Sequence, residues 1–353
     1  MYILLSYIYI LMKIGKIKLN HHSVPLIIPE MGINHGGKID IAIQIAKSAK
    51  KAGAKIIKNQ THIAEDEYSV EAKKIIPDNA NTNIVNIIKQ CELTEVEEYN
   101  LKNYVEKIGL EYLSTPFSKK AVDRLIKFNV KAFKIGSGEC NNYPLVEYIS
   151  NFGKPMIIST GMNSINSIRP TVEILRKKKI KFALLHCTNI YPTPHKLIRL
   201  NALKELKDAF PDAVLGLSDH STSNNACLGA VALGASILER HFTDTIERDG
   251  PDIVCSMDGV NLSNLISGSK EIFYSLGSNK NPIKEEQDTI NFAFASVVAI
   301  NEIKKNEKLT TENIWVKRPG NGDFLAKDYQ SLLGKTALKK IDKDTQISKK
   351  DII

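Results

Sequence analysis

The stretch AVLGLSDHSTSNNACLGAVALGASILERH, residues 213–241, decides the fold. It opens with an apolar run at Ala213–Leu217, continues through a segment of helical period at Asn224–Leu233, and ends in a second apolar run at Ala235–Leu238. This order is typical of a strand–helix–strand unit in a parallel sheet. Polar residues follow each apolar run directly, at the end of the strand where barrel enzymes build their sites.

The same pattern recurs from about residue 25 to residue 268. Its eight apolar runs are Leu26–Ile28, Ala54–Ile57, Tyr112–Leu113, Ala132–Phe133, Met156–Ile158, Phe182–Leu185, Ala213–Leu217 and Ala235–Leu238. Between them lie segments of helical period such as Ile39–Lys51, Val96–Lys107, Lys119–Phe128, Ile165–Lys178 and Asn224–Leu233. Eight units in this length favour a closed (β/α)8 TIM barrel over an open doubly wound sheet, so we predict an α/β barrel domain at 25–276.

The carboxyl-terminal part differs from the barrel segment in its residue composition and pattern. Residues 277–290 combine Gly, Ser, Asn, Pro and charges, which predicts a linker, and residues 291–353 form a predicted small β-rich domain. Short strands are expected at Phe292–Ile300 and Ile314–Lys317, with a further cluster at Lys335–Asp344. A domain of about 60 residues is near the lower limit for an independent core, so we expect it to lean on the barrel or on a partner subunit.

Composition excludes several classes of protein. The net charge is +9, but the basic residues are spread along the chain without an Arg-rich stripe, so nucleic-acid binding is not predicted. The five cysteines form no C-x-x-C pair and their number is odd, which argues against a disulfide framework or a zinc–cysteine site. We expect a cytoplasmic protein.

Residues 1–24 are predicted to be an extension that precedes the barrel. Its start, Met1–Met12, is apolar, and the charges follow the apolar run instead of preceding it, unlike a signal peptide. The run is also too short to span a bilayer. We therefore predict that translation begins at Met12, and that residues 1–11 are not a membrane anchor.

Two histidines occupy matched positions after consecutive predicted strands. His220 ends GLSDH and His241 ends LERH, so their imidazoles can converge on one point. Two imidazoles completed by water or substrate suit a divalent ion that acts as a Lewis acid. The alternative is two unrelated histidines that cap loops, but their matched positions favour the metal site.

Two lysines, Lys58 and Lys134, end the second and fourth predicted strands. A lysine at such a position is costly unless it meets an anion or forms a covalent adduct. The predicted anion site includes hydroxyl groups as further donors, those of Thr115, Ser137, Ser159 and Ser218. These hydroxyls favour a phosphate or carboxylate cradle, and the rival interpretation is a Schiff-base aldolase that uses Lys134.

The remaining candidates are carboxylates and a sugar-binding pair. Glu30 and Glu139 could transfer protons, and Asp252 could bind sugar hydroxyls, although a single loop acid is usually only solvated. Asn189 and Tyr191 offer an amide and an aromatic face that suit a sugar. A Pro-rich turn would also produce that pair.

The motifs at these positions resemble one family throughout. They are EMGINH (30–35), KNQTH (58–62), STPFS (114–118), KIGSGECNNYP (134–144), STGM (159–162), HCTNIYPTP (186–194), GLSDH (216–220) and LERHFT (238–243). From about residue 25 onward the chain resembles the bacterial N-acetylneuraminate (sialic acid) synthases. FAFAS (292–296) and WVKRPG (315–320) are similar to the antifreeze-like domain that ends those proteins.

This resemblance implies a role for each candidate. The residues implied to bind phosphoenolpyruvate are Lys58, Thr115, Lys134, Ser137, Ser159, Asn189 and Ser218. Those implied to line the sugar site are Gln60, Asn79, Glu139, Tyr191, Asp252, Phe292 and Arg318, the last from the partner chain of a domain-swapped homodimer. His220 and His241 would hold Mn²⁺, with Mg²⁺ or Co²⁺ as alternatives, and Glu30 or Glu139 would move protons.

One residue departs from the family pattern. Asn59 stands where family members commonly have His, between Lys58 and Gln60. If those two side chains point into the barrel, alternation along the strand turns Asn59 away from the interior. We expect little effect on the chemistry.

The resemblance implies a metal-dependent transferase that condenses phosphoenolpyruvate with N-acetylmannosamine and water to give N-acetylneuraminate and phosphate. A sister nonulosonate synthase, making legionaminic or pseudaminic acid from a 6-deoxy diacetamido sugar, is the nearest alternative. A Schiff-base aldolase and a catalytically inactive sugar-binding protein are more distant ones. No membrane partner is expected.

Overall fold

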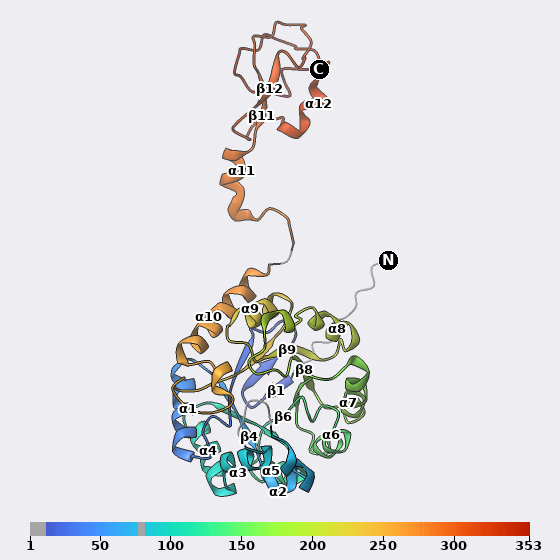
Figure 1. The fold of residues 1–353 in the computed structure, drawn as a ribbon. Helices are drawn as coiled ribbons and strands as arrows, with labels where there is room; N and C mark the ends of the chain where they lie inside the picture. Colours follow the sequence, from blue (N-terminus) through green and yellow to red (C-terminus); the bar gives the residue numbers. More distant parts are fainter. Residues whose placement is uncertain (1–11, 77–81, 278) are drawn as a thin grey trace. The chain divides into compact units, whose positions relative to one another are not determined.

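The structure is a computed structural model that describes residues 12–76, 82–277 and 279–353. The chain divides into two compact units, Met1–Gly277 and Ser278–Ile353. The first is an α/β barrel and the second is a small unit built around an antiparallel strand pair (Figure 1). The prediction about the translation start concerns residues 1–11, which lie outside the described residues.

The barrel is made of parallel strands, as predicted. Along the chain they are β3 (Leu26–Gly32), β4 (Ile56–Thr61), β5 (Glu111–Pro116), β6 (Phe133–Ile135), β7 (Met156–Ser159), β8 (Phe182–Cys187), β9 (Val214–Asp219) and β10 (Ile237–His241). The hydrogen-bonded order is β5-β4-β3-β10-β9-β8-β7-β6, so the first and last strands of the chain pair with each other. β5 and β6, at the two ends of this order, lie side by side and leave the barrel nearly closed. Every predicted apolar run contributes to one of these strands.

Helices alternate with the strands and surround them (Figure 1). The longer ones are α1 (Ile39–Lys51), α3 (Ile84–Cys91), α4 (Glu95–Lys107), α5 (Lys119–Lys127), α6 (Tyr143–Ser150), α7 (Ile165–Lys177), α8 (Ala202–Ala209), α9 (Asn225–Ala232) and α10 (Gly259–Ser275). The five predicted helical segments match α1, α4, α5, α7 and α9 to within one residue at each end. Side-chain caps at Thr94, Ser118 and Ser164 satisfy backbone N–H groups where α4, α5 and α7 begin.

A small apolar cluster fills the amino-terminal half of the barrel interior. Its strand members include Ile28, Ile56 and Ile237, and hairpin β1 (Met12–Ile14) and β2 (Ile17–Leu19) packs Met12 and Ile14 against them. Residues assigned in the sequence to an extension before the barrel therefore contribute to its core. Because this apolar layer occupies the amino end, polar side chains on the same inward faces are displaced toward the carboxyl end.

The second unit contains α11 (Gln287–Ala293), β11 (Ser296–Ala299) and β12 (Ile314–Lys317), and β11 pairs antiparallel with β12. The prediction for β12 is confirmed. The predicted strand at Phe292–Ile300 is wrong at its amino end, because Phe292 belongs to α11 and only Val297 and Ala299 reach the small core. The segment predicted as a linker also contains the start of α11.

Among the described residues, no helix is both long enough and apolar enough to cross a bilayer.

Candidate active site

Strand alternation brings the candidate residues to the carboxyl end of the barrel. In β4, Ile56 belongs to the interior apolar cluster, and two-residue steps lead from it to Lys58 and Gln60. In β10, the same steps lead from Ile237 to Glu239 and His241. Each strand therefore changes from apolar to polar along one inward face, and the site lies on top of the apolar layer.

Four buried charged groups form the centre of this site. Nζ of Lys58 lies 2.5 Å from Oε1 of Glu30 and 3.6 Å from Oε1 of Glu239. Nζ of Lys134 lies 3.6 Å from that same oxygen of Glu239. All four side chains are at most 5 % exposed, so each charge depends on the others for stabilisation.

Hydroxyl groups surround the two ammonium groups. Lys58 donates to Oγ1 of Thr115 at 3.3 Å, and Lys134 donates to Oγ of Ser159 at 2.7 Å. Ser218 donates to Oε1 of Glu239 at 3.1 Å. The predicted grouping of lysines and hydroxyls on neighbouring strands is therefore present, with a carboxylate at its centre.

Ser137 and Asn189 meet over Gly161, which follows β7. The backbone N–H of Gly161 donates to Oγ of Ser137 at 3.0 Å. A Cβ added at Gly161 would lie 1.8 Å from Oδ1 of Asn189 and 2.9 Å from Oγ of Ser137. Only glycine allows both side chains to approach here, next to Ser159 on the Lys134 side of the site.

The charged centre shifts the ionisation of its members in opposite directions. Burial opposes the charged form of Glu30, but Lys58 and His241 outweigh it and lower the pKa of Glu30. Burial also opposes the charge of Lys58, yet Glu239 and Glu30 raise its pKa. Burial lowers the pKa of Lys134, and the attraction of Glu239 offsets this only in part. Glu30 and Lys58 are thus a tight ion pair, and Lys134 is the less firmly charged lysine.

His220 and His241 converge as predicted. Their ring centroids are 5.4 Å apart, and Tyr191 packs against His220 with a centroid separation of 4.0 Å. Nδ1 of His220 lies 2.9 Å from the carbonyl oxygen of Thr188, and this contact orients the ring. Burial lowers the pKa of His220 to about 3, with His241 adding to the effect, so His220 is neutral near pH 7.

The donor set fits a divalent ion in part. A histidine that donates its Nδ1–H to a backbone carbonyl, as His220 can, is oriented in the manner usual for metal ligands. Nδ1 of His241 and Oε2 of Glu239 are buried without a hydrogen-bond partner among the described residues. No group of three or more His, Cys, Asp or Glu side chains in the described part of the chain is arranged as a metal site. Two histidines would therefore need oxygen ligands from water or substrate.

Glu139 differs from Glu30 in its surroundings. Burial raises the pKa of Glu139 to about 7, and the charge of Glu67 acts in the same direction. Its carboxylate lies over Gly136, where an added Cβ would be 2.6 Å from Oε2 of Glu139. The structure thus provides one firmly ionised carboxylate, Glu30, and one that titrates near neutrality.

Most of the predicted sugar-binding residues of the barrel are also at this end. Gln60 donates to Oε1 of Glu30 at 2.7 Å. Oδ2 of Asp252 lies 3.5 Å from Nδ1 of His241, and Tyr191, in the loop after β8, lies against the rings of both histidines. Asn79 lies outside the described residues.

Phe292 and Arg318 belong to the Ser278–Ile353 unit. Both are exposed, and Cζ of Arg318 lies 5.9 Å from the centroid of the Phe292 ring. The structure brings these two residues together with each other. Their action in an active site stays a prediction.

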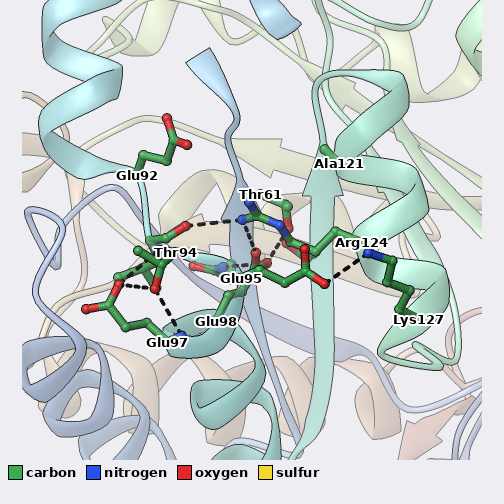
Figure 2. A network of polar contacts seen from close by, with 12 residues as sticks. Thr61, Glu92, Thr94, Glu95, Glu97, Glu98, Ala121, Arg124 and Lys127 are labelled. Carbon is green, nitrogen blue, oxygen red and sulfur yellow. Dashed lines mark hydrogen bonds and ion pairs between the residues drawn. The ribbon is translucent and has the colours of Figure 1, made fainter. Parts of the chain in front are cut away.

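Asn59 faces outward, as alternation predicts, and joins a buried polar network between β4, β5 and α4. Oε1 of Glu98 accepts hydrogen bonds from Asn59 at 3.3 Å, from Tyr112 at 3.0 Å and from Thr61, while Oε2 accepts from Arg124 at 3.0 Å. Figure 2 shows Arg124 reaching from α5 toward Glu98 on α4. The residue that departs from the family pattern therefore lies behind the site and not in it.

A cleft of about 1220 Å³ lies at the opposite end of the barrel. Hairpin residues Gly15–Leu19 line it together with side chains from the ends of α1 and α10. None of the predicted site residues contributes to it, so the chemistry-bearing groups and this cleft are separate.

Glu239 and His62 belong to the site but were not among the predicted site residues. Glu239 lies two residues before His241, and this spacing along a strand was the signal that both side chains point inward. His62 is two residues beyond Gln60, just past the end of β4, and contacts its amide. A histidine in a loop carries no comparable signal, so its contact with Gln60 required the structure.

Comparison with known proteins identifies a family for each of the two units. Residues 45–281 match the model of the NeuB family, and residues 294–353 match the SAF domain. An uncharacterized protein of Methanocaldococcus jannaschii is 41% identical over 88% of this chain and 89% of its own length. The N,N'-diacetyllegionaminic acid synthase of Campylobacter jejuni is 37% identical over 91% of this chain and 98% of its own.

Among solved structures, the N-acetylneuraminic acid (sialic acid) synthetase of Leptospira borgpetersenii superposes with a TM-score of 0.73 at 31% identity. The superposition covers 80% of this chain and 95% of the Leptospira protein. The family match extends over more than half of the chain, and the similarity to relatives continues through both units. The chain belongs to the NeuB family and ends in a SAF domain.

Proposed function

We propose that the protein condenses phosphoenolpyruvate with an N-acylated amino sugar and water, releasing phosphate and a nine-carbon sugar acid. The observation that carries this proposal is the pair of buried lysines, ringed by hydroxyl groups, within the same barrel mouth as two converging histidines. The lysines supply charge for an anionic substrate. The histidines supply nitrogen ligands beside it.

The lysines would hold the phosphate and carboxylate of phosphoenolpyruvate. Lys58 and Lys134 already share Glu239 as a counter-ion, which keeps both buried side chains compatible with folding. An incoming dianion would add charge-assisted hydrogen bonds from these ammonium groups and from Thr115 and Ser159. Preorganised donors of this kind stabilise charge that develops on the leaving phosphate.

His220 and His241 would hold a divalent ion, with Mn²⁺ the expected one. When bound, such an ion would polarise the aldehyde oxygen of the open-chain sugar toward attack by C3 of phosphoenolpyruvate. The chain's own contribution is to keep His220 neutral by burial and to orient it through Thr188.

Glu139 is the better candidate for proton transfer. A carboxyl group whose pKa is about 7 is both donor and acceptor near neutrality, whereas Glu30 is ionised and tied to Lys58. Glu139 would donate a proton to the aldehyde oxygen as the C–C bond forms. It would then accept one from the water that adds to C2 before phosphate leaves, so the two transfers balance.

The sugar is proposed to be N-acetylmannosamine, with a 6-deoxy diacetamido sugar as the second candidate. The second is favoured by the identity to the N,N'-diacetyllegionaminic acid synthase, and the first by the likeness to the sialic acid synthetase structure. Phosphate release should be measured with phosphoenolpyruvate, Mn²⁺ and each sugar in turn. Turnover of N-acetylmannosamine is expected, and turnover of the diacetamido sugar alone would overturn this choice while leaving the reaction class intact.

The Schiff-base aldolase remains the rival chemistry, because a lysine of lowered pKa such as Lys134 suits it. However, Nζ of Lys134 donates to Ser159 and to the carbonyl oxygen of Ile135. A nucleophilic amine would have to give up both contacts. Borohydride trapping of pyruvate on Lys134 would support the rival.

We further propose that Phe292 and Arg318 complete the sugar site of a partner subunit in a domain-swapped homodimer. The support is their exposure and mutual contact in the small unit, where an aromatic face and a guanidinium are presented together. Such a pair can pack against an N-acetyl group and donate to its carbonyl oxygen.

A further inference from the structure

A continuous line of hydrogen bonds leads from the charged centre to the short helix α2 (Ala64–Glu67). Oε1 of Glu30 accepts from Nε2 of Gln60 at 2.7 Å, and Oε1 of Gln60 lies 3.0 Å from Nε2 of His62. Nδ1 of His62 lies 2.8 Å from Oε2 of Glu67. Both His62 and Glu67 are less than a tenth exposed, so water does not replace these contacts.

The ionisation of Glu30 fixes the direction of the first two bonds in this line. Glu30 is ionised by its 2.5 Å contact with Lys58, so it can only accept, and the NH₂ group of Gln60 must face it. The amide oxygen of Gln60 then faces His62, which must carry a proton on Nε2. A histidine without that proton would set two lone pairs against each other and favour the reversed amide.

The ring of His62 is held in one plane. It stacks on Phe117 with a centroid separation of 4.4 Å and an interplanar angle of 6°. Glu67 faces the other nitrogen, so both ring nitrogens of His62 meet acceptors. Each nitrogen donates a hydrogen bond to its acceptor when it carries a proton.

Glu67 also acts on the proposed proton-transfer residue. After burial, its charge is the largest influence that raises the pKa of Glu139. The opposing charges around Glu139 are Lys134 on β6 and His62 after β4. Tyr68 and Cys140 are also influenced by the charge of Glu139, and burial raises the pKa of each.

We propose that His62 and Glu67 are a pair of positioning residues that hold the Gln60 amide with its NH₂ group toward Glu30, and that the two residues act on Glu139 electrostatically in opposite directions. The pair contacts neither the lysines nor the histidines of the predicted metal site. Its role rests on the proposed function, because Gln60 and Glu139 are assigned to the sugar side of that reaction. The pair would set the orientation of one sugar-binding group and the working pH of the proton carrier.

The kinetic test uses two variants that should shift the pKa of Glu139 in opposite directions. Glu67→Gln removes a negative charge, so the limb of the pH–rate profile assigned to Glu139 should move to lower pH. His62→Phe removes the electrostatic effect that opposes Glu67 at Glu139, and it removes the Nε2 donor, but it keeps the stacking partner of Phe117. Its limb should move to higher pH, and the sugar KM should rise about tenfold, as expected for the loss of one buried hydrogen bond. The KM for phosphoenolpyruvate should stay unchanged.

Matched variants separate these effects from loss of structure. Glu65→Gln makes the same change on the same short helix, where the side chain is 83% exposed, and should alter neither the limb nor the sugar KM. His62→Gln keeps an amide donor and should recover most of the sugar KM without reversing the pH shift. Shifts of the same sign in Glu67→Gln and His62→Phe, or an unchanged sugar KM in His62→Phe, would overturn the proposal.

A measurement that needs no turnover completes the test. Long-range ¹⁵N–¹H correlation spectra of histidine-labelled protein, assigned with His62→Phe, report which ring nitrogens carry protons. A proton on Nε2 of His62 is expected, and a His62 protonated on Nδ1 alone would overturn the inference. Because this readout is independent of substrate, failure of the proposed reaction and failure of the positioning pair are distinguishable.

Discussion

At the residue scale, two glutamates of the same barrel mouth are made different by their neighbours. Glu30 lies against Lys58 and stays ionised, whereas Glu139 is buried near the charge of Glu67 and titrates near neutrality. Groups whose surroundings separate their pKa values in this way take different roles in catalysis. The sequence named both as candidates for proton transfer but could not rank them, because their ranking depends on contacts with residues far away in the chain.

This difference predicts a specific result for the Glu139→Gln variant. Glu139→Gln cannot exchange a proton, so kcat should fall about 10²- to 10⁴-fold, the usual contribution of a general acid–base group. The fall should be accompanied by loss of the pH limb near 7. Steady-state rates between pH 5.5 and 8.5 check this expectation. If Glu139→Gln kept the wild-type pH–rate profile, proton transfer would be assigned to Glu30 instead.

The histidines make a prediction that is independent of activity. His220→Ala or His241→Ala should lose bound Mn²⁺, because removing either imidazole leaves a single nitrogen ligand. Metal content after dialysis against a limiting amount of Mn²⁺ measures this directly. His195→Ala, a change at an exposed histidine, is the matched control and should retain the ion. Full metal content in both active-site variants would refute the assignment.

At the element scale, β4 and β5 are fastened from behind by the network around Glu98. On β4, the outward residues Asn59 and Thr61 belong to this network and alternate with the inward residues Lys58 and Gln60. The network therefore holds the strands that present the site. Figure 2 also shows the exposed pair Glu95–Lys127 beside the buried pair Glu98–Arg124. The two pairs allow a comparison within one helix.

Glu98→Ala should destabilise the barrel by about 3–5 kcal/mol, because Arg124 would remain buried without its counter-ion. Glu95→Ala on the same helix should cost less than about 1 kcal/mol, because its pair with Lys127 is solvated. Urea unfolding of both variants gives the free energies. Equal losses in the two variants would show that the buried network contributes no more than a surface pair.

The elements that could be predicted best from the sequence were those with the most regular spacing of apolar residues. Strands such as β9 and helices such as α1 were predicted closely, because their apolar residues recur at one regular spacing over the whole element. Phe292 was assigned to a strand because it is apolar, although it lies exposed on α11. His62 and Glu98 were not predicted as functional or structural centres, because a single polar residue has no period.

At the scale of the whole molecule, the proposed chemistry lies in the barrel, and the small unit presents Phe292 and Arg318, which we propose to complete the sugar site of a partner subunit. The sequence predicted Phe292 and Arg318 for the sugar site only through family resemblance. No property of their local sequence indicates whether they contribute to the barrel of their own chain or of a partner chain, because that depends on how chains associate.

A mixing experiment tests the shared site. Glu139→Gln and Arg318→Ala homodimers should each be nearly inactive, and Lys317→Ala, at the neighbouring exposed residue, should remain active. In a swapped heterodimer, one barrel has both an intact Glu139 and an intact Arg318 from the other chain. Activity should therefore reappear when the two inactive proteins are unfolded and refolded together. Mixtures that stay inactive would show that each chain uses its own Arg318.

The central claim, that this barrel joins phosphoenolpyruvate to an amino sugar with the help of a metal held by His220 and His241, is tested most directly by the stoichiometry of the reaction. Phosphate and sugar acid should be measured together in the presence of Mn²⁺, with each substrate omitted in turn. The account predicts equal amounts of the two products, formed only when both substrates are present and abolished by EDTA. Product formation that persists in EDTA, together with pyruvate trapped on Lys134 by borohydride, would contradict it.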